Sequence, residues 1–137
     1  MNTFLPYSNF DECARVIDNK RLWKQILEAD GLIRLILDQK VKSHWRNHPC
    51  YKMWQNHPKA LTLYRNIFVN EWMRRRLFLP PFINLINQEE QANEWFPSWL
   101  GNKTLHLSHQ SNLVRKNPEC YRKFFPDVPD NIPYYWP

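Results

Sequence analysis

Glycine is scarce in this chain, and that scarcity limits the folds that the sequence can adopt. Only Gly31 and Gly101 occur among 137 residues, whereas 11 prolines interrupt the sequence. The hairpin turns of all-β proteins need positive φ angles, which glycine adopts most easily. The sequence therefore disfavours an all-β architecture with many turns. We predict an all-α protein, mainly helical with irregular loops, that forms a single compact domain over residues 1–137.

The strongest helical pattern covers about residues 8–38. Ser8 is a suitable N-cap, and acidic residues follow it in the first turn. Apolar residues then recur at steps of three and four, as one buried stripe requires. The stripe consists of Cys13, Ile17, Leu22, Ile26, Ala29, Ile33, Ile36 and Leu37. We predict one long helix with a kink near 18–19, in which Gly31 indicates close packing by a neighbouring element.

The unit Asn-His-Pro occurs twice and predicts two further helices. Proline suits the first helical position, because the N–H that it lacks would have no partner there. We predict a short helix over about 49–55 and a longer one over about 58–77. Three more helices are expected, at about 88–94, at about 104–115 and from Pro118, after the cap residue Asn117. The aromatic tail is expected to be extended and packed down.

The charge of the chain points to an anionic partner. Lys and Arg number 19 and Asp and Glu 13, which gives a net charge of +6 and a pI near 9.4. Nucleic-acid binders have such values, although an anionic membrane surface would also attract them. The sequence contains no apolar run long enough to span a bilayer and no signal-peptide pattern at its start. We expect a cytoplasmic monomer whose partner is DNA rather than a membrane.

The cysteine and histidine pattern argues against a metal centre. Cys13, Cys50 and Cys120 are odd in number and widely spaced, so they indicate neither a disulfide framework nor a Cys-x-x-Cys site. His106 and His109 are three apart, but no nearby cysteine pair or carboxylate completes a zinc site. Glycine-rich phosphate loops and His-Glu-x-x-His motifs do not occur. We predict no metal and no cofactor.

A polar stripe on the first long helix is the first candidate site. It consists of Arg21, Lys24, Gln25 and Glu28, whose spacings place them on one helix face. A carboxylate beside cations stays ionised and can stabilise a cationic intermediate, and the cations can hold phosphates. A solvated face with ordinary ion pairs has the same spacing, so the pattern leaves both interpretations open.

Two other polar segments are candidates. Residues 43–48 precede a predicted helix N-terminus and could bind an anion or a base edge there, or could simply cap that helix. Residues 106–116 place several hydrogen-bonding side chains on one predicted helix, where His109, Asn112 and Lys116 share a face.

Several segments together resemble the pyrimidine-dimer DNA glycosylase family, typified by phage endonuclease V, and most closely a bacterial branch of it. The segments are Thr3-Phe4-Leu5-Pro6-Tyr7, Arg21-Leu22-x-Lys24-Gln25, Trp45-Arg46-Asn47-His48-Pro49, Pro97-x-Trp99-Leu100-Gly101, Ser108-His109-x-Ser111-Asn112-Leu113-x-Arg115-Lys116, Phe125-Pro126-Asp127-Val128-Pro129 and Trp136-Pro137. The resemblance implies a compact endonuclease V-like helical domain. It also implies a Schiff base between C1′ of a flipped nucleotide and the α-amine, stabilised by a glutamate on the first helix.

The sequence departs from that family scheme at two positions. Asn2 follows Met1, which predicts that Met1 is retained and supplies the amine. An alignment without gaps places Gln25 where the glutamate is expected, and Glu28 lies one turn further on. Both departures argue against AP-lyase activity.

From these patterns and the resemblance we predict a DNA glycosylase for a damaged or modified pyrimidine in double-stranded DNA. The predicted catalytic residues are Met1, Arg21, Gln25, Glu28, His48 and His109. The predicted nucleic-acid-binding residues are Lys24, Trp45, Arg46, Asn47, Ser111, Asn112, Arg115 and Lys116. The alternatives are a non-catalytic nucleic-acid-binding module and an enzyme that acts on a nucleotide or another small anionic substrate.

Overall fold

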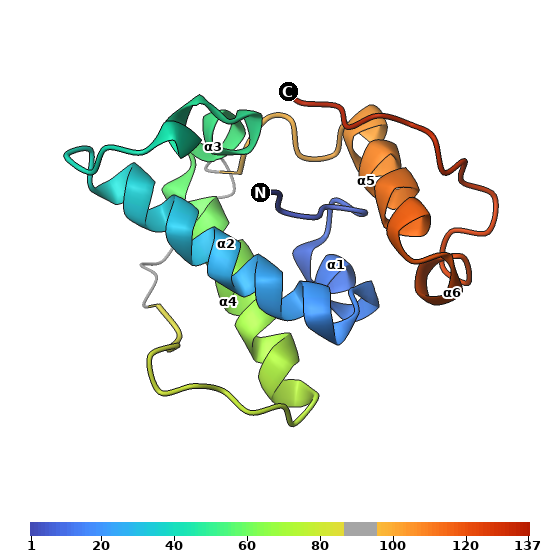
Figure 1. Cartoon of the computed structure of the whole chain (residues 1–137), viewed down its shortest axis with the longest axis horizontal. Helices are drawn as coiled ribbons and strands as arrows, with labels where there is room; N and C mark the ends of the chain where they lie inside the picture. Colours follow the sequence, from blue (N-terminus) through green and yellow to red (C-terminus); the bar gives the residue numbers. More distant parts are fainter. Residues whose placement is uncertain (87–95) are drawn as a thin grey trace.

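The computed structural model describes residues 1–86 and 96–137. Within these residues the chain forms six α-helices, one 3₁₀ helix (η1) and no strand (Figure 1), which confirms the predicted all-α fold class. The elements are α1 (Phe10–Val16), α2 (Asn19–Leu37), η1 (His44–Asn47), α3 (Pro49–Trp54), α4 (Pro58–Arg74), α5 (Lys103–Lys116) and α6 (Pro118–Tyr121). The helix expected near 88–94 lies outside the described residues.

The N-terminal helical region consists of two helices, so the prediction of one kinked helix was wrong. α2 begins after Asp18, whose side chain caps it by accepting a backbone N–H of the first turn. The Tyr121 hydroxyl accepts from the Asp18 N–H and donates to the Asp18 carboxylate. A residue distant in sequence therefore fixes the break. The N-cap of α1 is Asn9 rather than the expected Ser8, because the Asn9 side chain accepts a first-turn N–H.

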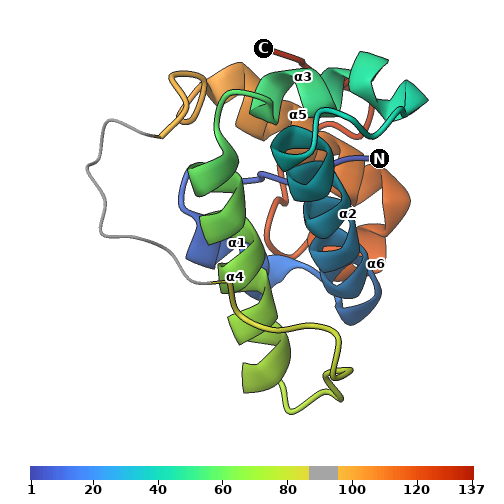
Figure 2. The same ribbon diagram turned by 90° about the vertical axis from the view of Figure 1, so that its left-hand side faces the viewer.

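Helices α2 and α4 lie side by side and bury their apolar faces between them (Figures 1 and 2). Leu22, Ile26 and Ala29 of α2 are fully buried, as the stripe predicted. Leu37 belongs to the same pattern but is exposed, because it is the last residue of α2. The close packing expected at Gly31 was also wrong: apart from its chain neighbours and the backbone of its own helix, no atom of the described residues lies within 4 Å of where its Cβ would be.

Both Asn-His-Pro units start a helix at their proline, as predicted. His48 is the N-cap of α3, because its Nδ1 accepts from the Cys50 N–H at 3.0 Å. α4 ends at Arg74, earlier than predicted. Arg74 and Arg75 bind the Glu71 carboxylate at 2.6 and 2.8 Å, so these arginines form a local ion cluster at the helix C-terminus.

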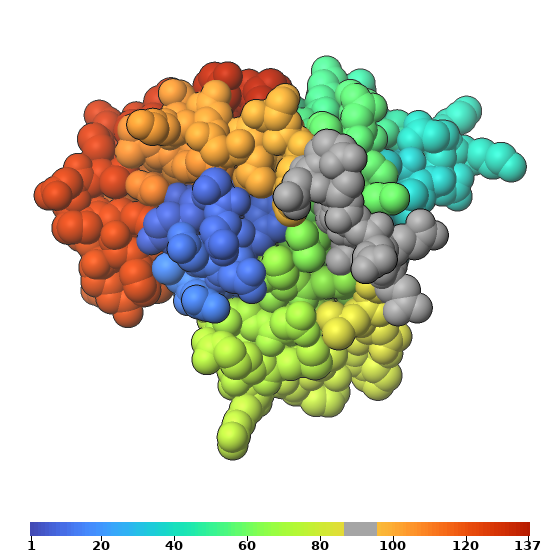
Figure 3. Space-filling model, turned by 180° about the vertical axis from the view of Figure 1, so that it is seen from behind, coloured from blue at the N-terminus to red at the C-terminus, as the bar shows by residue number. Residues whose placement is uncertain are grey.

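Residues 1–7 run between α2 and α5 (Figure 1). The N-terminal part of the chain, blue in Figure 3, also reaches the opposite face of the molecule, where it lies between α5 and α4. His106 and His109 of α5 hold Leu5: the Leu5 N–H donates to His109 Nδ1 at 2.8 Å, and His106 Nδ1 donates to the Leu5 carbonyl at 2.7 Å. Gln25 of α2 accepts from the Phe4 N–H at 2.7 Å. These contacts fix the chain start next to the polar face of α2.

The C-terminal tail is extended and packs on α5, as predicted. Ser111 Oγ accepts from the Ile132 N–H at 3.0 Å, and Ser108 Oγ accepts from the Tyr135 N–H at 3.1 Å. These bonds bring Tyr134 next to the N-terminal segment. Across residues 1–86 and 96–137, none of the helices is both long and apolar enough to cross a membrane.

Candidate functional site

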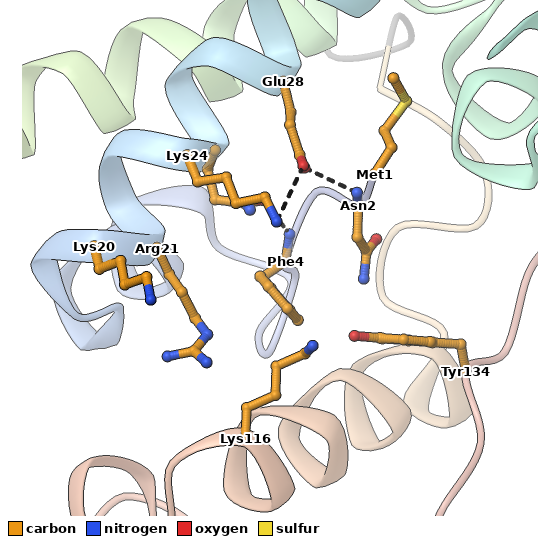
Figure 4. Close-up of a pocket in the computed structure, with 10 residues that line it drawn as sticks. Met1, Asn2, Phe4, Lys20, Arg21, Lys24, Glu28, Lys116 and Tyr134 are labelled. Atoms are coloured by element: carbon orange, nitrogen blue, oxygen red, sulfur yellow. Dashed lines mark hydrogen bonds and ion pairs between the residues drawn. The ribbon is translucent and has the colours of Figure 1, made fainter.

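A pocket of about 320 Å³ opens where α2, the N-terminal segment, the end of α5 and the C-terminal tail meet (Figure 4). This volume is at the lower end of the range for small-molecule sites. The predicted site residues that line it are Met1, Arg21, Lys24, Gln25, Glu28 and Lys116. The lining residues that were not predicted are Asn2, Phe4, Lys20 and Tyr134. The polar face of α2 is therefore a pocket wall rather than an ordinary solvated face.

The Glu28 carboxylate lies beside the start of the chain. Its Oε2 accepts from the Asn2 backbone N–H at 2.8 Å, and its Oε1 is 3.8 Å from Lys24 Nζ. The Glu28 side chain is 15% exposed and the Lys24 side chain 68% exposed. The carboxylate is thus held inside the pocket, while the ammonium group reaches solvent. Because Asn2 directly follows Met1, a fixed carboxylate stands one residue away from the N-terminal amine.

Gln25 occupies the base of the pocket and is almost completely buried. Its Oε1 accepts from the Phe4 N–H at 2.7 Å and from the Tyr64 hydroxyl at 3.2 Å. The Gln25 amide therefore ties the N-terminal segment to α2 and α4. The resemblance placed the catalytic carboxylate at this position, but in the structure the carboxylate of the pocket comes from Glu28, one helical turn further on.

Four cationic side chains line the same pocket as Glu28, and they are Lys20, Arg21, Lys24 and Lys116 (Figure 4). Burial lowers the pKa of Lys116, and the neighbouring charges of Arg21 and Lys24 lower it further. Like charges this close repel one another, and a bound anion would relieve that repulsion. The electrostatics of the pocket therefore suit a phosphate group.

The residues that sequence reasoning missed differ in how detectable they were. Lys20 lies four residues before Lys24 and on the same helix face, so helical spacing could have identified it. Asn2 and Tyr134 come from opposite ends of the chain and from segments without regular structure. No local pattern marks them, because only the tertiary fold brings them together.

His109 lies away from the pocket, beneath the N-terminal segment. It is fully buried, and its Nδ1 accepts from the Leu5 N–H. Burial lowers the pKa of His109 to about 3, and the neighbouring His106 adds to the effect. A neutral imidazole at this position keeps the acceptor that Leu5 needs. The structure thus gives His109 a positioning role for the chain start.

Ser111, Asn112 and Arg115 also lie outside the pocket, where they hold the tail. The Ser111 hydroxyl binds Ile132, and Asn112 Nδ2 donates to the Ile132 carbonyl at 3.1 Å. Arg115 donates to the Asp130 carbonyl at 3.2 Å and to Asn112 Oδ1. Lys116 at the end of α5 is the predicted residue of this segment that reaches the pocket.

Arg46 closes the C-terminal end of α2. Its guanidinium donates to the carbonyl oxygens of Leu35, Asp38 and Val41 at 2.7, 2.8 and 2.7 Å. It also donates to the Tyr51 hydroxyl at 2.8 Å. A guanidinium group has five N–H donors, so these bonds leave little capacity for a phosphate. Its position therefore favours a structural role over the predicted role in DNA binding.

Trp45, Asn47 and His48 form a surface beside the pocket. Trp45 and Asn47 are exposed, and the His48 ring contacts Trp45 and Trp136 with centroid distances of 5.6 and 5.7 Å. Burial lowers the pKa of His48, and the positive Met1 amine lowers it further. His48 is therefore within electrostatic reach of the chain start, although it does not line the pocket.

The fold and the pocket define a class of protein: a small all-α protein in which the chain start, a carboxylate and several cations meet at one pocket. Residues 1–78 match the family model described as pyrimidine dimer DNA glycosylase. The matched segment is more than half of the chain and includes α1 to α4. The chain therefore belongs to the pyrimidine dimer DNA glycosylase family, which confirms the resemblance. Comparisons with curated proteins and with solved structures give no match.

Proposed function

We propose that this protein is a DNA glycosylase that acts on a damaged or modified pyrimidine, with the Met1 amine as its nucleophile. The observation that carries the proposal is the position of Glu28, which is hydrogen bonded next to the chain start within a cationic pocket. Membership of the family supports DNA as the substrate and a pyrimidine as the target.

In the proposed reaction the neutral Met1 amine attacks C1′ of the target nucleotide, and the N-glycosidic bond breaks as the base leaves with a proton. Opening of the sugar ring gives an imine between C1′ and the amine. The protonated imine is cationic, and the Glu28 carboxylate stabilises that charge at short range. Hydrolysis of the imine releases the abasic site. If β-elimination from the imine came first, it would cleave the strand.

The pocket cations and its size support a nucleotide that has left the duplex. Lys20, Lys24 and Lys116 come from α2 and α5 on opposite sides of the pocket, where phosphates on either side of one nucleotide can bind (Figure 4). A pocket of about 320 Å³ has room for one base that has left the duplex. The proposal therefore requires base flipping, whose unpairing cost is lowest for a damaged or mismatched base.

Borohydride trapping tests the proposal. The chain with a free Met1 amine is incubated with a duplex that contains pyrimidine dimers and with a panel of modified-pyrimidine duplexes. We expect abasic sites or nicks and, after reduction, a covalent protein–DNA adduct. The matched control carries a short N-terminal extension, which displaces the amine but retains every side chain. The control should bind DNA and give no adduct.

Two results would overturn the proposal in different ways. Salt-dependent DNA binding without any product would indicate a non-catalytic binding module. Thermal stabilisation by thymidine 5′-monophosphate without affinity for DNA would indicate an enzyme for a small anionic substrate. The small cationic pocket is the observation that favours this second candidate.

A further inference from the structure

The pocket contains a buried hydrogen-bond donor without a partner. Asn2 is 8% exposed, and its Oδ1 accepts from the Thr3 N–H at 2.8 Å, which fixes the orientation of the amide. The Nδ2 group of the same amide forms no hydrogen bond of ordinary geometry within the described part of the chain, although the amide lies close enough to the Tyr134 hydroxyl to lower the pKa of that phenol. It points into the space bounded by Lys116 and Tyr134 (Figure 4). A buried donor in this state costs free energy, and an acceptor on a ligand would remove the cost.

Tyr134 presents a second neutral donor to the same space (Figure 4). Ring contacts with Phe4 and His109 hold it in place, with centroid distances of 6.5 and 5.5 Å. Burial raises the pKa of Tyr134, and the nearby Asn2 amide offsets part of that rise. The phenol is therefore protonated at neutral pH and able to donate.

We infer that Asn2 and Tyr134 form a base-reading pair, in which the Asn2 amide and the Tyr134 hydroxyl donate to a carbonyl oxygen of the bound pyrimidine. The inference rests on the proposed function, because it names what that site recognises. Neutral donors match a neutral carbonyl group, whereas the cations Lys24 and Lys116 in the same pocket match phosphates. The pair selects for a carbonyl at this point of the base and against an amino group, since two donors would then face each other.

Affinity measurements with oxygen-altered bases test the pair. The probes are duplexes with one mismatched thymine, the same thymine without O4, and the same thymine with sulfur in place of O2. The variant Asn2→Asp keeps the acceptor for the Thr3 N–H and removes the donor. Tyr134→Phe removes the hydroxyl alone. Asn131→Asp, at an exposed position outside the pocket, is the charge-matched control. Intact mass confirms that Met1 is present, and thermal unfolding confirms the fold of each variant.

One altered oxygen should weaken binding to the unmodified protein and to Asn131→Asp by about 10-fold. The same alteration should cost Asn2→Asp only about threefold, because the bond from Asn2 no longer exists there and only the bond from Tyr134 is lost. Tyr134→Phe should also show a smaller loss of affinity for the altered base than the unmodified protein does. This variant still tests the inference if Asn2→Asp does not fold. The negative charge that Asn2→Asp adds does not affect the comparison, because each penalty is the ratio of two affinities measured with the same variant.

Three outcomes would overturn the inference. One is the absence of any penalty in the unmodified protein, and another is an equal penalty in Asn2→Asp. In a third arm, a methylphosphonate replaces the phosphate beside the thymine, and loss of that penalty in Asn2→Asp would mean that Asn2 holds a phosphate. Failure of the proposed function is distinguishable: an Asn2-dependent penalty without a trapped adduct removes the glycosylase activity and retains the base-reading pair.

Discussion

Helices α2 and α5 both carry a row of polar side chains, but they use these rows differently. On α2, Lys24 and Glu28 face a pocket. On α5, His109, Ser111 and Asn112 are buried and hydrogen bonded to the two ends of the chain. The polar row of α5 therefore builds the scaffold against which the polar row of α2 forms a pocket.

The difference shows that spacing on a helix does not separate a structural polar row from a functional one. The two kinds of polar row differ in what lies opposite each of them in the fold. Residues 1–7 and the tail have irregular backbone, and their buried N–H and C=O groups need partners. The side chains of α5 supply those partners, so its polar row is used within the protein. On α2, Lys20 and Lys24 line the open pocket instead, while Arg21 pairs with Asp18 at 3.2 Å.

The largest expected effect is on α2. Glu28→Gln should slow formation of the trapped adduct about 100-fold, or about 3 kcal/mol, because the amide cannot offset the charge of the imine. The amide oxygen still accepts from the Asn2 N–H, so the free energy of unfolding should change little. Single-turnover trapping and urea denaturation measure the two quantities.

Gln25→Glu provides the matched test of which position holds the working carboxylate. It should not raise the rate of trapping, because Gln25 Oε1 is committed to Phe4 and Tyr64. Restoration of activity by Gln25→Glu in the Glu28→Gln background would contradict the assignment to Glu28.

The second prediction concerns the polar row of α5 and its pH dependence. Burial lowers the pKa of His109 from its ordinary value of 6.5 to about 3. The folded protein therefore binds fewer protons than the unfolded chain below pH 6.5, so stability decreases as the pH falls. Between about pH 7 and about pH 5 we expect His109 to contribute a loss of about 2 kcal/mol, measured by urea denaturation across that range.

His109→Asn is the control for this pH dependence. The asparagine Oδ1 retains an acceptor for the Leu5 N–H but does not titrate. The variant should be less stable at neutral pH, because it loses ring packing, yet its stability should fall less steeply with acid. The same slope in both proteins would mean that other groups dominate acid unfolding, including His106, whose pKa burial also lowers.

The starts of the helices that begin with proline and the all-α class could be predicted because they depend on local chemistry. Proline at a first helical position and an apolar stripe at helical spacing act within a few residues. The break at Asp18 could not be predicted in the same way, because Tyr121 fixes it from the far end of the chain. The role of Arg46 could not be predicted for the same reason. Its partners are the carbonyl oxygens at the end of α2, which no motif reveals.

The pocket was predictable only on its α2 side. Arg21, Lys24 and Glu28 share a face by spacing alone, and the structure places all three at the pocket. Asn2 and Tyr134 complete it from residues 132 positions apart, which depends on contacts of α5 with both chain ends. Sequence patterns identify one wall of a site, and long-range packing supplies the rest.

The third prediction compares two adjacent cations at the end of α5. Lys116 lines the pocket, so Lys116→Ala should weaken DNA binding several-fold and lower the salt dependence by about one ion. Arg115 binds the tail, so Arg115→Ala should instead lower the free energy of unfolding by about 1 kcal/mol. Salt titrations of binding and urea denaturation separate the two effects. Identical behaviour of the two variants would remove the distinction between pocket and scaffold within α5.

The smallest expected effect is that of a substitution at Gly31, which tests whether α2 acts on DNA through its polar face alone. Gly31 lies inside α2 with open space around its missing Cβ, so an alanine methyl there contacts only its chain neighbours and the backbone of its own helix within 4 Å among the described residues. Gly31→Ala should raise the free energy of unfolding by about 0.5–1 kcal/mol, because alanine loses less backbone entropy in a helix. The rate of adduct trapping should not change, since Gly31 lies outside the pocket. A stabilised protein with slower trapping would instead show that the reaction needs α2 to bend at Gly31, and that the backbone of this helix takes part as well as its polar face.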